Sequence, residues 1–135
     1  MMRTIGHYVG FFLSMLLLSS CGKGGCNVIP NVTFQTNINR GSHVNVYSPH
    51  GWSNAAGGVR GLIVYNTGDG LVAYDRCSTV NPEQRNQVEV DGLLIVDRAS
   101  GAKWLLMDGS PTHLAECALR RYSVRRDGDN YYVSN

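Results

Sequence analysis

Glycine-containing turns recur at short intervals along the chain and leave only short segments between them. Asp91-Gly92 separates residues 88–90 from residues 93–96, and a turn around Asp127-Gly128 separates residues 121–126 from residues 131–133. An Asp-Gly pair between two β-prone runs is the strongest short-range signal for a hairpin. Strands this short, with turns this regular, predict an antiparallel all-β domain.

Further short segments have the same character. The segments expected to form strands are residues 32–38, 44–47, 59–65, 71–74 and 103–107. The stretch 48–58 is rich in Pro, Gly, Ser and Asn, so we expect a loop there. No window after residue 20 has a convincing helical period.

The N-terminus has the organisation of an export signal. Arg3 precedes an apolar run at residues 8–18, which is too short to favour a permanent membrane span. Residues 18–21, Leu-Ser-Ser-Cys, resemble the bacterial lipobox. The resemblance implies that residues 1–20 are removed and that Cys21 accepts a diacylglyceryl group. The alternative is an ordinary signal peptide with a chance cysteine at the cleavage site.

The predicted mature chain divides into a short tether and one domain. We expect residues 21–30 to form a lipidated, flexible tether and residues 31–135 to form a single β domain. The whole chain has 12 cationic and 10 acidic residues, and loss of Arg3 leaves 11 against 10. This near balance argues against a nucleic-acid partner. Three cysteines remain after Cys21, namely Cys26, Cys77 and Cys117, so at most one intramolecular disulfide can form.

Several motifs occur in an order that is similar to a known family. They are residues 58–65, 71–77, 101–104, 107–110, 118–122 and 131–133. In this order they resemble the Rieske domain, in particular the small Rieske-like lipoproteins of Bacteroidetes. The resemblance implies a fold of short antiparallel sheets with two ligand loops at one tip.

The resemblance also identifies four ligand positions, of which three have lost their ligand type. A Rieske cluster needs Cys-x-His in one loop and Cys-x-x-His in the other. Here Cys77 and Asp97 stand at the thiolate positions, and Thr79 and Ser100 stand at the imidazole positions. Neutral hydroxyls are poor ligands for such a centre, so we expect no [2Fe–2S] cluster and no other cofactor.

The resemblance further places the loop of His113 and Cys117 over this tip. It implies that Cys77 and Cys117 form a disulfide, which leaves Cys26 free. An alternative is a mononuclear metal site made by Cys77, Asp97, His113 and Cys117, whose side chains are plausible zinc donors. The simpler interpretation is that His113 is a solvated loop residue and Asp97 a turn residue, with no metal.

Other conspicuous residues have structural explanations. Arg120, Arg121, Arg125 and Arg126 are interpreted as solvated strand positions beside core-facing residues, in preference to an anion-binding patch. No spacing indicates a catalytic triad, a phosphate-binding loop or paired catalytic carboxylates.

The sequence therefore predicts a lipid-anchored domain of the cell envelope, facing the periplasm, that is not an enzyme. Its expected role is structural or interactive, with an unknown protein partner and a membrane contact through Cys21. The alternatives are a Rieske-type [2Fe–2S] electron-transfer protein and an envelope protein that binds a single metal ion.

Overall fold

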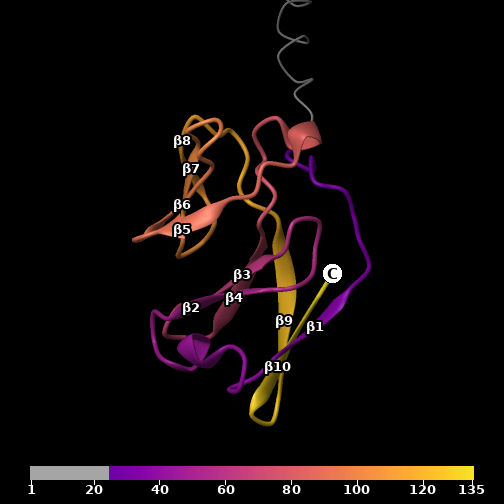
Figure 1. The fold of residues 1–135 in the computed structure, drawn as a ribbon, viewed down its shortest axis with the longest axis vertical. Coiled ribbons are helices and arrows are strands. Elements are labelled where there is room, and N and C mark those ends of the chain that lie inside the picture. The colour runs from indigo at the N-terminus through magenta and orange to yellow at the C-terminus, as the bar shows by residue number, and fades with distance from the viewer. Residues whose placement is uncertain (1–24) are drawn as a thin grey trace, which may run out of the picture.

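A computed structural model describes residues 25–135 of the chain (Figure 1). The predicted signal peptide, the lipidation site Cys21 and the first residues of the tether lie outside the described residues. Within residues 25–135, no helix has the length and hydrophobicity needed to cross a membrane.

Ten short strands and two 3-10 helices make up the described chain. In order, they are β1 (Gln35–Ile38), η2 (Val44–Tyr47), β2 (Trp52–Ala55), β3 (Leu62–Asn66), β4 (Leu71–Asp75), η3 (Pro82–Gln84), β5 (Glu89–Asp91), β6 (Leu94–Val96), β7 (Lys103–Leu105), β8 (Pro111–His113), β9 (Arg121–Asp127) and β10 (Asn130–Ser134). The prediction of an all-β domain is confirmed.

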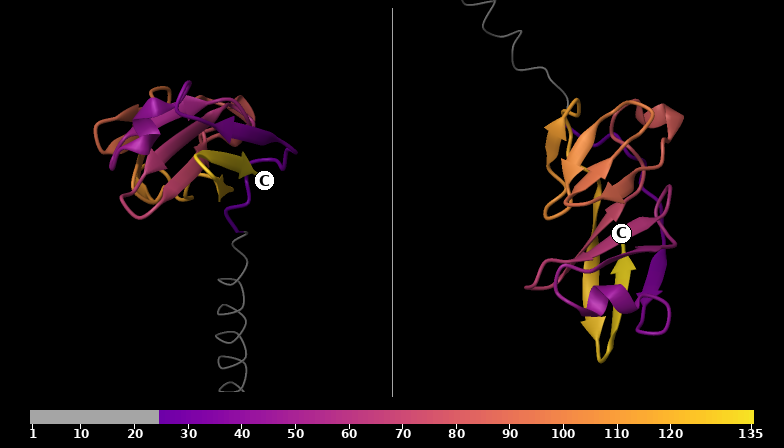
Figure 2. Two further views of the ribbon diagram at one scale, coloured as in Figure 1. Left: turned by 90° about the horizontal axis from the view of Figure 1, so that it is seen from below. Right: turned by 60° about the vertical axis from the view of Figure 1, so that its left-hand side comes forward.

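The strands form two antiparallel sheets. The larger sheet has the order β1-β10-β9-β4-β3-β2, and the smaller one has the order β5-β6-β7-β8. Figure 1 shows the smaller sheet at one end of the molecule and the β9–β10 turn at the opposite end. Strand β9 begins near the smaller sheet and runs the length of the larger one, as the second view in Figure 2 also shows.

The β3–β4 hairpin is buried on both faces, so it contributes to two hydrophobic cores. Leu62 and Val64 of β3 pack with Ala73 of β4, whereas Ile63 and Tyr74 pack in the core shared with the smaller sheet. Successive side chains of a strand point to opposite faces, so the alternation along each strand divides it between the cores. This hairpin of the larger sheet therefore also packs against the smaller sheet.

Residues 44–47 form a 3-10 helix, so the predicted strand there is wrong. Val46 is fully buried, and the hydroxyl of Tyr47 donates a hydrogen bond to the carbonyl of Asp129 at 2.6 Å. Gly51 then passes so close to the Asn45 carbonyl that a Cβ atom would collide with it. These tertiary contacts override the β preference of two valines and a tyrosine.

The loop predicted at residues 48–58 contains strand β2, which is a second correction. Its residues are not typical strand formers, but they pair antiparallel with β3, from Trp52 opposite Tyr65 to Ala55 opposite Leu62. Residues 111–113, expected in a loop, also pair as β8 with β7 across a register irregularity. In both cases a neighbouring strand supplies the hydrogen bonds, and local sequence does not encode them.

Candidate functional site

The two predicted ligand loops lie side by side. The first follows β4 and carries Cys77 and Thr79, and the second follows β6 and carries Asp97 and Ser100. Hydrogen bonding to Ser78 of the first loop acts on the carboxylate of Asp97 in the second. The structure therefore brings together the two loops that the resemblance singled out, and their side chains make the hydrogen bonds described below.

Asp97 organises its own turn. Its carboxylate accepts hydrogen bonds from the Ser100 hydroxyl at 2.7 Å and from the Ala99 N–H at 3.0 Å, and it is almost fully buried. Burial alone would raise the pKa of Asp97, but these hydrogen bonds, with that of Ser78, hold the pKa below its usual value. The carboxylate is thus ionised, and its oxygens are engaged within the turn.

Cys77 is a free thiol without solvent access. It is fully buried, and its backbone N–H donates to Asp75 at 2.9 Å. Burial, and to a lesser extent the charge of Asp75, raise the pKa of the Cys77 thiol. The buried Cys77 side chain is therefore a neutral thiol.

The side chain of Thr79 is also hydrogen-bonded within the tip. Its hydroxyl donates to the carbonyl of Cys117 at 2.9 Å, and the indole N–H of Trp104 donates to the same carbonyl at 2.9 Å. The fully buried Trp104 and the first ligand loop therefore hold the segment of Cys117 over the tip. The hydroxyl of Thr79 therefore stabilises the tip at the position where the resemblance implies an imidazole.

These side chains do not fit a Rieske cluster. The four positions that the resemblance identifies hold one thiol and no imidazole, and Asp97, Ser100 and Thr79 are committed to hydrogen bonds. They do not form the proposed mononuclear site either, because Cys117 is in a disulfide and no group of three or more His, Cys, Asp or Glu residues within residues 25–135 is arranged to hold a metal ion.

The disulfide joins Cys26 to Cys117, so the predicted Cys77–Cys117 pair is wrong. The two Cα atoms lie 5.2 Å apart, and 91 positions separate the residues in the sequence. Ile29, three residues later, is buried. From Cys26 onward, the segment predicted to be a flexible tether is therefore fixed to the domain.

Arg120 has a structural role that the sequence did not reveal. It was interpreted as a solvated strand position, but its guanidinium binds the N-terminal segment and the C-terminus together. It donates to the side chain of Asn31 at 2.6 Å, to the carbonyl of Ile29 at 3.3 Å and to the side chain of Asn135 at 3.0 Å. Arg121, Arg125 and Arg126 are exposed, as expected.

Asp75 is a second residue that sequence reasoning missed. It ends β4, is fully buried, and accepts four hydrogen bonds, from the N–H groups of Val59, Arg60 and Cys77 and from the hydroxyl of Tyr122. No pattern in the sequence indicated a buried carboxylate there. It connects the turn before β3 with the first ligand loop and with β9.

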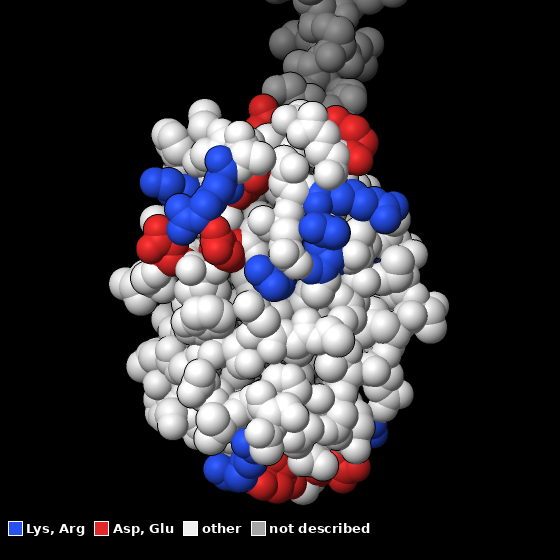
Figure 3. Space-filling model, in the orientation of Figure 1, with Lys and Arg blue, Asp and Glu red and all other residues white. Residues whose placement is uncertain are grey.

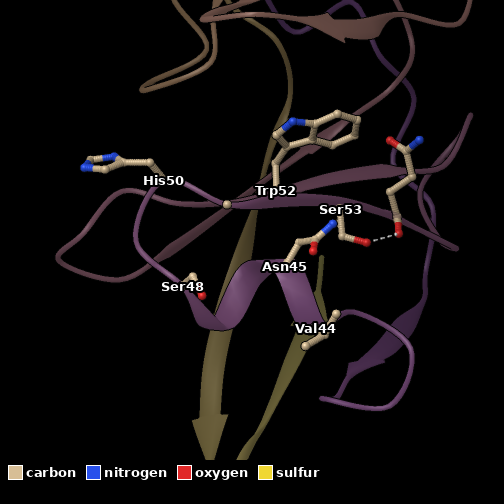
Figure 4. Close-up of a pocket in the computed structure, with 8 residues that line it drawn as sticks. Val44, Asn45, Ser48, His50, Trp52 and Ser53 are labelled. Atoms are coloured by element: carbon tan, nitrogen blue, oxygen red, sulfur yellow. Dashed lines mark hydrogen bonds between the residues drawn. The ribbon is translucent and has the colours of Figure 1, made fainter.

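A surface hollow lies beside η2 and β2. It is lined by Val44, Asn45, Ser48, His50, Gly51, Trp52, Ser53 and Asn54. Figure 4 shows that the rings of His50 and Trp52 point away from the polar side chains of Asn45 and Ser53. His50 Nδ1 instead lies 3.1 Å from the Tyr65 hydroxyl. The polar groups of a specific small-molecule site converge on one point, and those of this hollow do not.

Comparisons with known proteins bear on the fold. No protein-family model matches the chain, and no curated protein matches it. A chain from the complex of reduced oxygenase and oxidized ferredoxin in carbazole 1,9a-dioxygenase matches with a TM-score of 0.52 and 17% sequence identity. The match covers 78% of this chain and 94% of that chain. Together with the two antiparallel sheets, this similarity shows that the chain has an all-β, Rieske-like fold.

Proposed function

We propose that this Rieske-like domain holds no iron–sulfur cluster and serves as a non-catalytic structural or interaction domain of the cell envelope, anchored through lipid on Cys21. One observation carries the proposal: the side chains at all four ligand positions are buried or hydrogen-bonded within the tip. Asp97 binds Ser100 and the backbone of its turn, Thr79 binds the carbonyl of Cys117, and Cys77 is a buried thiol.

The hydrogen bonds at the tip stabilise the fold in the place of a cluster. A bound [2Fe–2S] unit ties two loops together through covalent ligands. Here the bond between Ser100 and Asp97 closes the second loop, and the bond from Thr79 to the Cys117 carbonyl connects the first loop to the segment of Cys117. The tip therefore has its own means of holding its shape, which a protein without a cluster requires.

The proposed anchor rests on the sequence of residues 18–21 and on the charge and apolar pattern before it. One acyl chain binds a membrane only marginally, whereas two or more chains hold firmly. A lipidated Cys21 would accordingly keep the domain at the membrane surface, with a protein partner still to be identified.

The first prediction is that the purified domain, residues 22–135, contains no cluster. After anaerobic reconstitution with iron and sulfide, we expect no stoichiometric iron, no labile sulfide and no Rieske-type electron paramagnetic resonance signal on reduction. The physical reason is the loss of both imidazoles, which bind one iron of the Rieske centre. A folded domain with stoichiometric iron and that signal would refute the proposal and favour the electron-transfer alternative.

A matched variant makes this experiment informative. The triple variant Thr79→His, Asp97→Cys, Ser100→His restores the ligand types next to Cys77 and is reconstituted in parallel. If the triple variant binds iron and the parent does not, these three side chains account for the difference. Stoichiometric zinc or another single metal ion in the parent would instead support the mononuclear alternative.

The second prediction concerns the anchor. Cys21→Ser should abolish lipid attachment, because the thiol of Cys21 is the proposed acceptor, and should leave an unprocessed or mislocalised precursor. Intact mass spectrometry of the membrane fraction measures this, with the unsubstituted protein as the control. A mature protein that starts at another residue and carries no lipid mass would contradict the anchor.

A further inference from the structure

The disulfide fixes the start of the described chain to the end of the molecule that carries the ligand loops. Cys26 is bonded to Cys117, whose carbonyl accepts hydrogen bonds from Thr79 in the first ligand loop and from Trp104. Figure 1 and the right-hand view of Figure 2 place the start of the described chain at the end with η3 and the smaller sheet. The β9–β10 turn lies at the opposite end of the long axis.

Covalent geometry limits how far this end can lie from the proposed anchor. Five residue steps separate Cys21 from Cys26. A fully extended chain spans at most about 3.6 Å per residue, so the two residues can be separated by no more than about 18 Å. The lipid that the proposed function places on Cys21 would therefore hold the disulfide end close to the membrane.

An apolar residue is exposed at this end. Leu114 is 64% exposed and has a φ of +59°, a conformation that bulky side chains rarely adopt. It lines a surface hollow together with Val28, Val80 and Cys117 and with the polar residues Thr79, Asn81 and Glu116. Strain of this kind persists only where the surroundings enforce it, and it often marks a functional surface.

The charged residues near this hollow favour a membrane contact that does not depend on anionic lipids. Glu83 and Glu116 are both exposed at this end, and Arg85, which caps η3, is an exposed cation. Figure 3 shows acidic side chains at the top of the molecule, beside the place where the described chain begins. This mixed charge gives no strong attraction to anionic lipids, so the contact must depend on the anchor and on apolar side chains.

We propose that, in the lipidated protein, the surface formed by Val28, Val80, Leu114 and the Cys26–Cys117 disulfide rests on the phospholipid bilayer; we call it the disulfide face. This inference rests on the proposed anchor at Cys21. The ligand loops then face the membrane, where a soluble electron-transfer partner has no access. The β9–β10 hairpin projects away from the membrane and is available to partners.

The orientation is tested with nitroxide labels on the full-length lipidated protein in phosphatidylcholine vesicles. One label is placed through Leu114→Cys on the disulfide face, and a matched one through Asp127→Cys at the end of β9. We expect the label at position 114 to lie about 5–10 Å below the headgroup surface and to be protected from an aqueous nickel chelate. The label at position 127 should stay fully accessible, and equal accessibility at both positions would overturn the orientation.

A spacer variant separates this inference from the proposed anchor. A long Gly-Ser insertion between Gly24 and Gly25 lengthens the tether but leaves the disulfide and the fold intact, so the protection at position 114 should be lost. Unchanged protection in the spacer variant would show that the short tether does not set the orientation. Intact mass spectrometry of each sample reports the lipid: its absence refutes the anchor, whereas its presence with an exposed position 114 refutes only the orientation.

Discussion

Replacement of both Cys26 and Cys117 with alanine should lower the free energy of unfolding by roughly 4–5 kcal/mol, the value that the chain-entropy model gives for a loop of this length. The two residues are 91 positions apart, so the crosslink restricts most of the unfolded domain. Small domains are stable by about 5–15 kcal/mol, so the variant should lose a large part of its stability.

Urea denaturation of the described domain, followed by circular dichroism, measures this loss. The parent protein in reducing buffer should match the double variant, because reduction removes the same crosslink. Cys77→Ala is the control for a cysteine outside the disulfide: it keeps the Cys26–Cys117 crosslink, so it should lose as much stability as the parent when reductant is added. Peptide mapping without reduction should recover Cys26 linked to Cys117, and a Cys77–Cys117 peptide or a loss below about 1 kcal/mol would contradict the prediction.

Local turn chemistry explains why much of the fold was predictable. Asp91-Gly92 lies at the β5–β6 turn and Asp127-Gly128 at the β9–β10 turn, where Gly92 and Gly128 both have positive φ values. A turn of this kind needs the residues that tolerate such a conformation, so the sequence itself records it. The hairpins, and with them the all-β class, follow from these positions.

The errors concern contacts between residues that are distant in the sequence. Strand β2 exists because β3 offers its hydrogen bonds, and η2 forms because Val46 and Tyr47 have partners in the core and at Asp129. The disulfide partner of Cys117 depends on where residue 26 lies in space. Spacing along the chain does not contain that information, and the family resemblance began only after residue 57.

The two loops of the candidate site could be singled out from the sequence, but their interactions could not. The resemblance placed Cys77, Thr79, Asp97 and Ser100 in two loops, and the structure brings those loops together. It gave no indication that Thr79 binds the Cys117 carbonyl or that Asp97 holds its own turn. The hydrogen-bond partners of a short polar side chain depend on ångström-scale placement, which the residue type alone does not specify.

Replacement of Asp75 should also destabilise the fold strongly, because its buried carboxylate accepts hydrogen bonds from four donors. The N–H of Val59 and the hydroxyl of Tyr122 donate to Oδ2, both at 2.6 Å, and the N–H groups of Arg60 and Cys77 donate to Oδ1 at 3.1 and 2.9 Å. Burial, followed by the hydrogen bond to Asp75, raises the pKa of Tyr122, so this hydroxyl stays protonated and remains a donor. Every group that faces Asp75 in these bonds is thus a donor.

Asp75→Asn should therefore lower the free energy of unfolding by about 3 kcal/mol. In either orientation of the new amide, its NH₂ group faces two of the four donors, and the hydrogen bonds of those two donors are lost.

Tyr122→Phe is the matched control. It removes one donor but keeps the ring that packs edge-on against Phe34, with 4.7 Å between the ring centroids. It should lower the free energy of unfolding by about 1 kcal/mol. Urea denaturation of both variants beside the parent measures the difference. Equal losses in the two variants would show that the backbone donors do not depend on the carboxylate. A larger loss for Asp75→Asn would establish that Asp75 holds the turn before β3, the loop of Cys77 and strand β9 together.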